Sequence, residues 1–180
     1  EDLVKHIDDQ KDVDGLKQSS PYTSCTALAV LEILRFYNIT PRQKQVLVVG
    51  RSKTVGDPIA RLLRKYGGHV SVSHSGTDRN EFIEHVREAD IIVSAAGVPG
   101  LIDGGLVKRG AVLVDVGISV IDNRITGDIQ HSQTTDYRYT PVPGGVGPVT
   151  VAMLMQNLTV AAYKSSPSKD LSSFGITAFT

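Results

Sequence analysis

Short apolar runs separated by longer amphipathic stretches set the pattern of this chain. Four runs rich in Val, Ile and Ala predict buried strands, and a weaker run predicts a fifth. These strands lie at residues 45–50, 69–74, 90–97, 111–118 and, more weakly, near 127–129. Apolar residues at helical spacing predict helices at residues 21–38, 57–66, 78–89 and 149–163. The pattern indicates an α/β fold, a Rossmann-type doubly wound, mostly parallel sheet.

The rest of the chain divides around this predicted sheet. Residues 90–97 and 111–118 are apolar at nearly every position, which is typical of parallel strands buried on both faces. Residues 1–20 are mostly polar and predict a connecting or edge segment. Residues 21–165 make up the predicted domain, and the Ser-rich residues 166–180 predict a loosely held tail.

The chain length limits the number of domains, and the net charge limits the kinds of binding partner. With 180 residues the chain is long enough for one well-buried core and little more. Its 19 basic and 19 acidic residues balance, which predicts no nucleic-acid partner and no anionic membrane surface. The densest basic group, Arg61, Arg64 and Lys65, fits the solvated face of a helix. No apolar run approaches the roughly 20 residues of a membrane span, and we predict no metal site.

The cysteine content bears on the compartment. Cys25, the single cysteine, cannot form an internal disulfide, which fits a reducing environment. It shares a helical pattern with Ala27 and Leu28, so we expect a buried structural thiol rather than a nucleophile. The acidic start of the chain has no apolar signal segment. We expect a cytoplasmic protein, with an organellar origin left open.

The stretch after the first strand has the features of a phosphate-binding turn. Gly50 ends a buried strand, Gly56 follows six residues on, and a helix with Pro58 in its first turn begins at once. A dinucleotide requires such a turn, because N–H groups at the helix N-terminus must approach the pyrophosphate. A Cβ at Gly56 is then expected to obstruct the pyrophosphate without unfolding the domain. The spacing departs from G-x-G-x-x-G, which leaves open a structural turn that binds nothing.

The end of the second strand favours one dinucleotide over the other. An NAD site usually places an Asp or Glu there to bind the ribose 2′-hydroxyl. Residues 74–77 contain no carboxylate before Asp78. Arg51 could pair with a 2′-phosphate and Ser75 could donate a hydrogen bond to it, which favours NADP over NAD. The alternative is that Arg51 and His74 are plain surface residues.

These residues also carry a family resemblance. Residues 50–58, GRSKTVGDP, resemble the GRSxxVGxP turn of the bifunctional methylenetetrahydrofolate dehydrogenase/cyclohydrolase family. Residues 140–148, TPVPGGVGP, are similar to its signature almost letter for letter, and residues 11–15, KDVDG, resemble a third motif. Residues 89–93, 115–118 and 127–129 look like further family landmarks, in the right order. The resemblance runs from about Lys11 to Ala162.

The resemblance implies a set of binding residues. The candidate cofactor residues are Gly50, Arg51, Ser52, Val55, Gly56, Ser75 and Ile118. The candidate substrate residues, expected to face the folate pterin, are Asp14, Pro143, Gly144 and Gly145. No catalytic residue is assigned, because the family's catalytic lysine, tyrosine and glutamine come from an N-terminal region with no counterpart here. Residues 1–20 are accordingly a remnant or linker of that catalytic domain.

Three functions compete on this basis. The leading one is NADP-dependent oxidation of 5,10-methylenetetrahydrofolate to the methenyl compound, followed in the complete protein by hydrolysis to 10-formyltetrahydrofolate. The second is an NADP-binding module or fragment without folate catalysis, and on either view the isolated chain is expected to be inactive or nearly so. The third, an NADP-dependent reductase of another substrate, is disfavoured by residues 140–148. A homodimer is a further possibility in this family.

Overall fold

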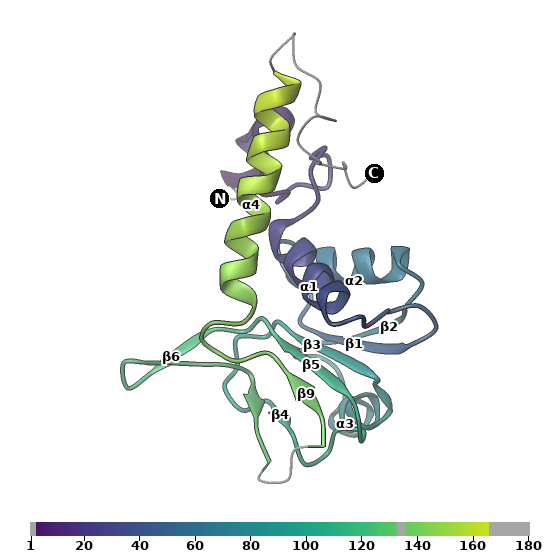
Figure 1. Ribbon diagram of the computed structural model, residues 1–180. Coiled ribbons are helices and arrows are strands. Elements are labelled where there is room, and N and C mark those ends of the chain that lie inside the picture. Colours follow the sequence, from purple (N-terminus) through teal and green to yellow (C-terminus); the bar gives the residue numbers. More distant parts are fainter. Residues whose placement is uncertain (1–2, 133–135, 166–180) are drawn as a thin grey trace.

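A five-stranded parallel sheet lies at the centre of the computed structural model, which describes residues 3–132 and 136–165 (Figure 1). The strand order is β2-β1-β3-β5-β9. Their bounds are β1 Gln45–Val49, β2 His69–Ser73, β3 Ile91–Ser94, β5 Val112–Asp115 and β9 Arg138–Tyr139. The chain moves outward from β1 to β2 and then returns to the other side of β1 at β3. This reversal is the switch point at which open α/β sheets bind ligands.

Helices cover both faces of the sheet, as the hydrophobic pattern predicts. The helices are α1 Cys25–Phe36, α2 Gly56–Lys65, α3 Arg79–Glu88 and α4 Val146–Lys164. Val46 and Val48 pack in one core cluster with residues of α1 and α2, whereas Leu47 and Val49 pack in another with Val86 of α3. Figure 1 shows α1 and α2 on one side of the sheet and α3 on the other. The α/β Rossmann-type sheet is therefore confirmed, including the two strands buried at every position.

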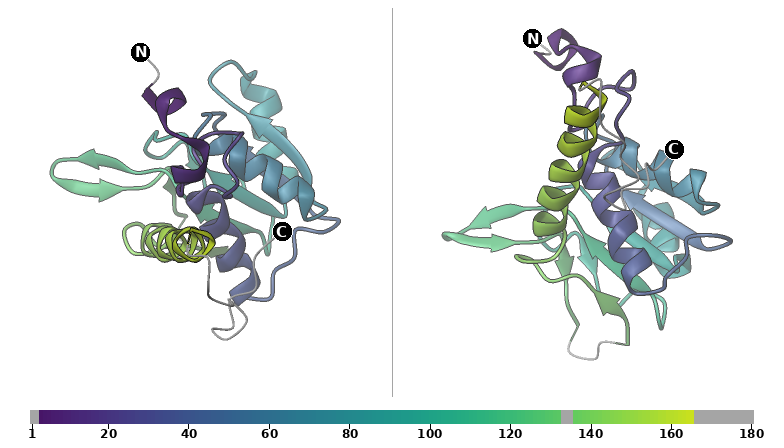
Figure 2. Two further views of the ribbon diagram at one scale, coloured as in Figure 1. Left: turned by 90° about the horizontal axis from the view of Figure 1, so that it is seen from above. Right: turned by 45° about the horizontal axis from the view of Figure 1, so that its top comes forward.

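The fifth strand of the sheet is not the one expected. Residues 127–129 do not join it: β8, Ile129–Gln130, pairs instead with β4, Ile102–Asp103, in a separate two-stranded sheet. The edge position belongs to β9, which pairs with β5 through Arg138 and Tyr139. Both residues are exposed and polar or amphipathic, so no apolar run marks this strand. A hairpin of β6, Ser119–Ile121, and β7, Arg124–Thr126, was likewise not expected and projects from the domain (Figures 1 and 2).

Helix α4 begins three residues earlier than predicted and stands beside α1 (Figure 2). By length and composition alone it is apolar enough to cross a membrane, contrary to the expectation from sequence. Its contacts are those of a domain helix: Asn157 is buried and its Nδ2 donates to the carbonyl oxygens of Val13, at 2.9 Å, and Thr23, at 3.0 Å. These bonds tie α4 to the segment that leads into α1.

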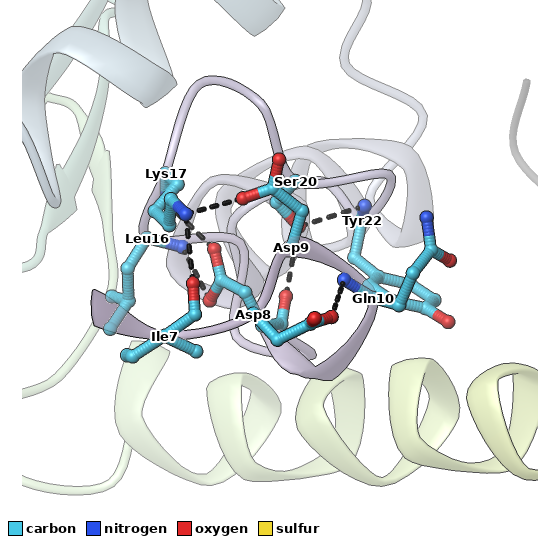
Figure 3. Close-up of polar contacts among 9 residues, drawn as sticks. Ile7, Asp8, Asp9, Gln10, Leu16, Lys17, Ser20 and Tyr22 are labelled. Carbon is cyan, nitrogen blue, oxygen red and sulfur yellow. Dashed lines mark hydrogen bonds and ion pairs between the residues drawn. The ribbon is translucent and has the colours of Figure 1, made fainter. Parts of the chain in front are cut away.

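The N-terminal segment is folded and is not an edge strand. It forms two 3-10 turns, η1 Leu3–His6 and η2 Asp9–Lys11. Lys17 connects them, since its ammonium pairs with Asp9 and donates to the carbonyl oxygen of Ile7 (Figure 3). The carboxylate of Asp12 accepts from the backbone N–H groups of Leu16 and Lys17. The expected assignment of residues 1–20 to a linker stays a prediction, and the expected tail at 166–180 lies outside the described residues.

Candidate dinucleotide-binding site

The turn between β1 and α2 lies at the carboxyl edge of the sheet. Gly50 has φ +110°, and a Cβ there would overlap the carbonyl oxygen of Ala95 in the neighbouring strand's loop. Only glycine satisfies both the positive φ and this close approach. The Ser52 hydroxyl oxygen accepts from the N–H groups of Val55, at 3.2 Å, and Gly56, at 3.3 Å. Ser52 therefore holds the turn closed as well as lining the cavity beside it.

Gly56 is required for a different reason from the one expected. It is buried, and a Cβ there would overlap the carbonyl oxygen of Gly50 across the turn. The side chain would strike the turn's own backbone before it met any cofactor. The expectation that a Cβ at Gly56 would obstruct the pyrophosphate without affecting the fold is therefore wrong in its reason. A bulkier residue should distort the turn itself.

A cavity of about 850 Å³ opens beside this turn. Arg51 and Ser75, both predicted cofactor residues, line it together with Gly50, Ser52 and His74. At its other end it is lined by apolar side chains of α3 and of the loops before and after β4 (Ile102–Asp103), namely Phe82, Ile83, Val86, Leu101 and Leu106. One end can thus receive phosphate and ribose, while the other offers an apolar slot for a flat ring.

At the end of β2, residues 74–77 bond among themselves and supply no carboxylate to the cavity. The backbone N–H of His74 donates to the Thr77 hydroxyl at 3.0 Å, and His74 Nδ1 accepts from the Gly76 N–H at 3.0 Å. Asp78 is the next carboxylate, and it caps α3 by accepting from the N–H groups of Asn80 and Glu81. The Asp78 carboxylate is therefore engaged with the N-terminus of α3 and does not line the cavity.

A second cavity, of about 680 Å³, brings together five more of the predicted residues. Pro143, Gly144 and Gly145 line it on one side, and Val55 and Ile118 also lie in its wall. Ala95 and Ala96, just after β3, line both cavities. The two cavities therefore adjoin at the switch point, along the carboxyl edge of the sheet, and together we call them the cleft. We call them the nucleotide cavity, beside Arg51, and the loop cavity, beside Pro143.

Asp14 does not reach this cleft. It is not among the described residues that line either cavity, and its carbonyl oxygen accepts from the Cys25 N–H at 3.1 Å near the start of α1. Burial, reinforced by the nearby Asp14 carboxylate, raises the pKa of the Cys25 thiol to about 12. The expectation of a buried structural thiol is confirmed.

Two buried carboxylates hold the shared wall of the cleft. Asp128 accepts from the Ser94 hydroxyl and from the N–H groups of Ala96, Gly97 and Val98, all at 2.8–3.1 Å. Asp115 in turn accepts from the N–H groups of Asp128 and Ile129, both at 3.1 Å. Burial raises the pKa of the Asp115 carboxyl above its ordinary value.

The sequence reasoning noted these two aspartates only as landmarks. An Asp that ends an otherwise apolar strand, as at 112–115, was a usable signal, because a buried carboxylate must find donors. Glycines make room for both: a Cβ at Gly117 would overlap the Asp128 carboxylate, and one at Gly127 would overlap that of Asp115.

The parallel sheet, the glycine turn and the cleft at the switch point define a Rossmann-type dinucleotide-binding domain. Within this class, residues 24–166 match the tetrahydrofolate dehydrogenase/cyclohydrolase NAD(P)-binding domain family. The chain belongs to that family, as the resemblance implied.

Individual relatives and solved structures support the same family. The chain is 38% identical over 174 residues to the bifunctional protein FolD of Macrococcus caseolyticus, covering 91% of this chain and 61% of that protein. Among solved structures, the methylenetetrahydrofolate dehydrogenase-cyclohydrolase of Trypanosoma brucei, complexed with NADP and an inhibitor, superposes with a TM-score of 0.83 at 36% identity, covering 92% of this chain and 62% of that one. The 5,10-methylenetetrahydrofolate dehydrogenase of the silkworm Bombyx mori gives 0.84 at 37% identity, covering 92% and 64%. The chain thus spans about three fifths of the length of these relatives.

Proposed function

We propose that this chain is the NADP-binding part of an enzyme that oxidises 5,10-methylenetetrahydrofolate to 5,10-methenyltetrahydrofolate. In the complete protein the methenyl product would then be hydrolysed to 10-formyltetrahydrofolate, in one-carbon metabolism. The observation that carries the proposal is the pair of adjoining cavities, one beside the Arg51 turn and one beside the Pro143–Gly145 loop, which share Ala95 and Ala96 at the switch point. The names of the relatives at 36–38% identity support the same activity.

The residues of the chain fit a dinucleotide. Gly50 permits close approach of the backbone at the turn, and the nucleotide cavity combines cations with an apolar slot. Bound NADP would supply the chemistry by accepting a hydride from the folate carbon. The chain's own part is orientation, because a hydride step requires the two reactants within about 3–3.5 Å of each other. Pro143, Gly144 and Gly145 are placed to shape the folate side of the loop cavity.

NADP rather than NAD is the proposed cofactor. Arg51 is exposed at the cavity and forms no ion pair within the described residues, so its charge is available to a 2′-phosphate. A charge-assisted hydrogen bond contributes about 1.5–3 kcal/mol, so Arg51→Ala should weaken NADP binding by about ten- to a hundredfold. NAD binding should hardly change. Titration of both dinucleotides into both proteins measures this, and equal wild-type affinity for NAD and NADP would contradict it.

The chain alone should bind NADP without efficient folate turnover. The family's activating lysine has no counterpart in this sequence, and a positioned general acid or base typically contributes about 10²–10⁴ in rate. The assay follows NADPH absorbance with methylenetetrahydrofolate, beside direct NADP binding on the same mass-verified sample. Robust turnover would contradict the reading of this chain as a cofactor-binding part. Binding without turnover is also what the alternative, a non-catalytic NADP module, requires.

Fusion to the N-terminal region of a relative separates these two functions. If a relative's N-terminal region restores NADPH formation when it is fused ahead of residue 1, the chain is the cofactor part of a dehydrogenase. If the fusion folds and stays inactive, the module is favoured. A homodimer and a cytoplasmic location, with no nucleic-acid or membrane partner, complete the proposal; sedimentation of the purified chain with and without NADP tests the dimer.

A further inference from the structure

Arg79 is the first residue of α3 and belongs to the face of that helix that lines the nucleotide cavity. The lining residues from α3 are Arg79, Phe82, Ile83 and Val86, at the spacing i, i+3, i+4 and i+7. Residues at this spacing share one helix face. Three of the four are apolar and form the slot described above. The fourth, Arg79, is a cation, and it lies near the end of β2 because it is the first residue of α3.

The charge of Arg79 has no partner within residues 3–132 and 136–165, since neither a hydrogen bond nor an ion pair engages its guanidinium there. Other arginines of the domain are committed: Arg61 pairs with Asp57, and Arg64 donates to the carbonyl oxygen of Val70. The nearest carboxylate in sequence, Asp78, is engaged in capping α3. Arg79 is therefore free to meet a ligand.

Arg79 and Arg51 reach the same cavity from different elements. Arg51 comes from the turn after β1, and Arg79 comes from the helix after β2. His74 lies in the lining with them, and because its Nδ1 accepts the Gly76 N–H, the proton of the neutral ring is on Nε2, which is left as a donor. One carboxylate, Asp103, also lines the cavity; it stands on β4, and its Oδ1 accepts from the Gly105 N–H.

We propose that Arg79 is a second reader of the 2′-phosphate of NADP and acts together with Arg51. This inference rests on the proposed function. A phosphate monoester carries close to two negative charges at neutral pH, which a single arginine leaves partly unbalanced. Guanidinium groups suit it because each presents several donors in a planar fork. The chain thus selects NADP by two cations on separate elements, in addition to lacking a carboxylate at the end of β2.

The test compares Arg79→Ala with Arg87→Ala in the full chain. Arg87 is an exposed arginine of the same helix that does not line the cavity. Calorimetric titrations use NADP, NAD, adenosine 2′,5′-bisphosphate and 5′-AMP, which differ pairwise by the 2′-phosphate. We expect Arg79→Ala to bind NADP and the bisphosphate about tenfold more weakly, because the contact is exposed and screened. NAD and 5′-AMP should bind as in the wild type, Arg79→Lys should retain part of the preference, and Arg87→Ala should retain all of it.

The outcomes separate this inference from the proposed function. If the wild type prefers NADP and Arg79→Ala keeps the full preference, the role of Arg79 is overturned while NADP binding stands. Equal weakening of NADP and NAD in Arg79→Ala, or equal loss in Arg87→Ala, would also overturn it, because a structural or general charge effect would then suffice. A wild type that binds neither dinucleotide would overturn the proposed function, and the inference with it.

Discussion

The two cavities of the cleft are built in different ways. The nucleotide cavity draws mainly on residues 49–86, one continuous strand–helix–strand–helix stretch, with the loop after β3 closing it. The loop cavity is assembled from parts far apart in sequence, including Val55, Ala95, Val116 and Pro143. The first depends on local turns and caps. The second is built from distant loops, so it depends more on the buried aspartates, which hold the wall that both cavities share. Perturbations of the two should therefore differ in kind.

The largest effect is expected from Asp128→Ala. The change removes the acceptor of four hydrogen bonds, a buried one from the Ser94 hydroxyl and three part-buried ones from the N–H groups of the Ala96–Val98 loop. An unmet buried donor costs about 1–3 kcal/mol and a part-buried one less, because water can reach it, so we expect a decrease of about 3 kcal/mol in the free energy of unfolding. Urea denaturation measures this decrease.

The matched control is Glu84→Ala, an exposed carboxylate on α3. It should change the stability by less than about 0.5 kcal/mol. Asp128→Asn keeps one oxygen acceptor and should lie between the two. Similar losses for Asp128→Ala and Glu84→Ala would show that the aspartate does not hold the loop.

The same glycine-to-alanine change should have opposite effects on stability in the turn beside the nucleotide cavity, at Gly56, and beside the loop cavity, at Gly147. At Gly56 the new Cβ would overlap the Gly50 carbonyl oxygen, whereas at Gly147, in the first turn of α4, it would meet nothing within 4 Å. We expect Gly56→Ala to cost about 2–3 kcal/mol, as over-packing does. Gly147→Ala should instead stabilise by about 0.5–1 kcal/mol, since alanine favours helix.

Thermal unfolding of both variants tests the contrast, and NADP titration of Gly56→Ala adds a second readout. The distorted turn should weaken NADP binding together with stability. If Gly56→Ala lost NADP affinity at unchanged stability, the original expectation about the pyrophosphate would be restored. Equal shifts of the same sign in the two variants would refute the contrast.

Asn157→Ala perturbs a part of the chain outside both cavities. Two carbonyl oxygens, those of Val13 and Thr23, lose their donor, which should cost about 2 kcal/mol. NADP affinity should stay as in the wild type. The neighbouring Gln156→Ala is the control for helix α4, and a drop in NADP affinity in Asn157→Ala would show that the N-terminal segment is coupled to the cleft.

The smallest effect concerns pH and Asp115. Burial raises the pKa of this carboxyl in the folded protein above its ordinary value of 3.8, so the folded state holds the proton more tightly than the unfolded state does. Its contribution to stability is fully present below pH 3.8 and is lost as pH rises through the raised pKa. The stability lost in Asp115→Asn should therefore be smaller at pH 7 than at pH 4. Chemical denaturation at both values measures the difference, and a loss that grows with pH would contradict the assignment.

The sequence predicted the nucleotide cavity better than the loop cavity for a physical reason. Gly50, Ser52 and the N-cap Asp78 act within a few residues of their own positions, so local patterns reveal them. The strand β9 was missed because its two residues are exposed and carry no apolar pattern. The partners of Asp128 lie 30–34 residues away, a distance at which no pattern in one sequence indicates a contact.

Most of the binding residues that the family resemblance implies line the cleft, but not all of them do. Arg51, Ser75, Ile118 and Pro143 all line the cleft, but their contacts with a cofactor or folate stay predictions. Asp14 lies by Cys25 instead, a placement that depends on how residues 12–25 turn back onto α1 and α4. Arg79 was overlooked because a lone arginine at a helix start resembles any solvated residue until the opposite wall of the cavity is known.

Cys25 can serve as a chemical probe for local opening of the junction between the N-terminal segment, α1 and α4. Its thiol lies where the N-terminal segment, α1 and α4 meet, with Sγ 3.6 Å from the carbonyl oxygen of Val13 and 3.4 Å from Asn157 Nδ2. With a pKa of about 12, roughly one thiol in ten thousand is ionised at pH 8, and a thiol-directed reagent cannot reach it while the junction is closed. Since the chain has a single cysteine, its alkylation reports only openings that expose this junction, and the alkylation rate equals the opening rate when the reagent reacts faster than the junction recloses. A slower alkylation of Cys25 in the fusion protein would show that the fused N-terminal region stabilises the closed junction.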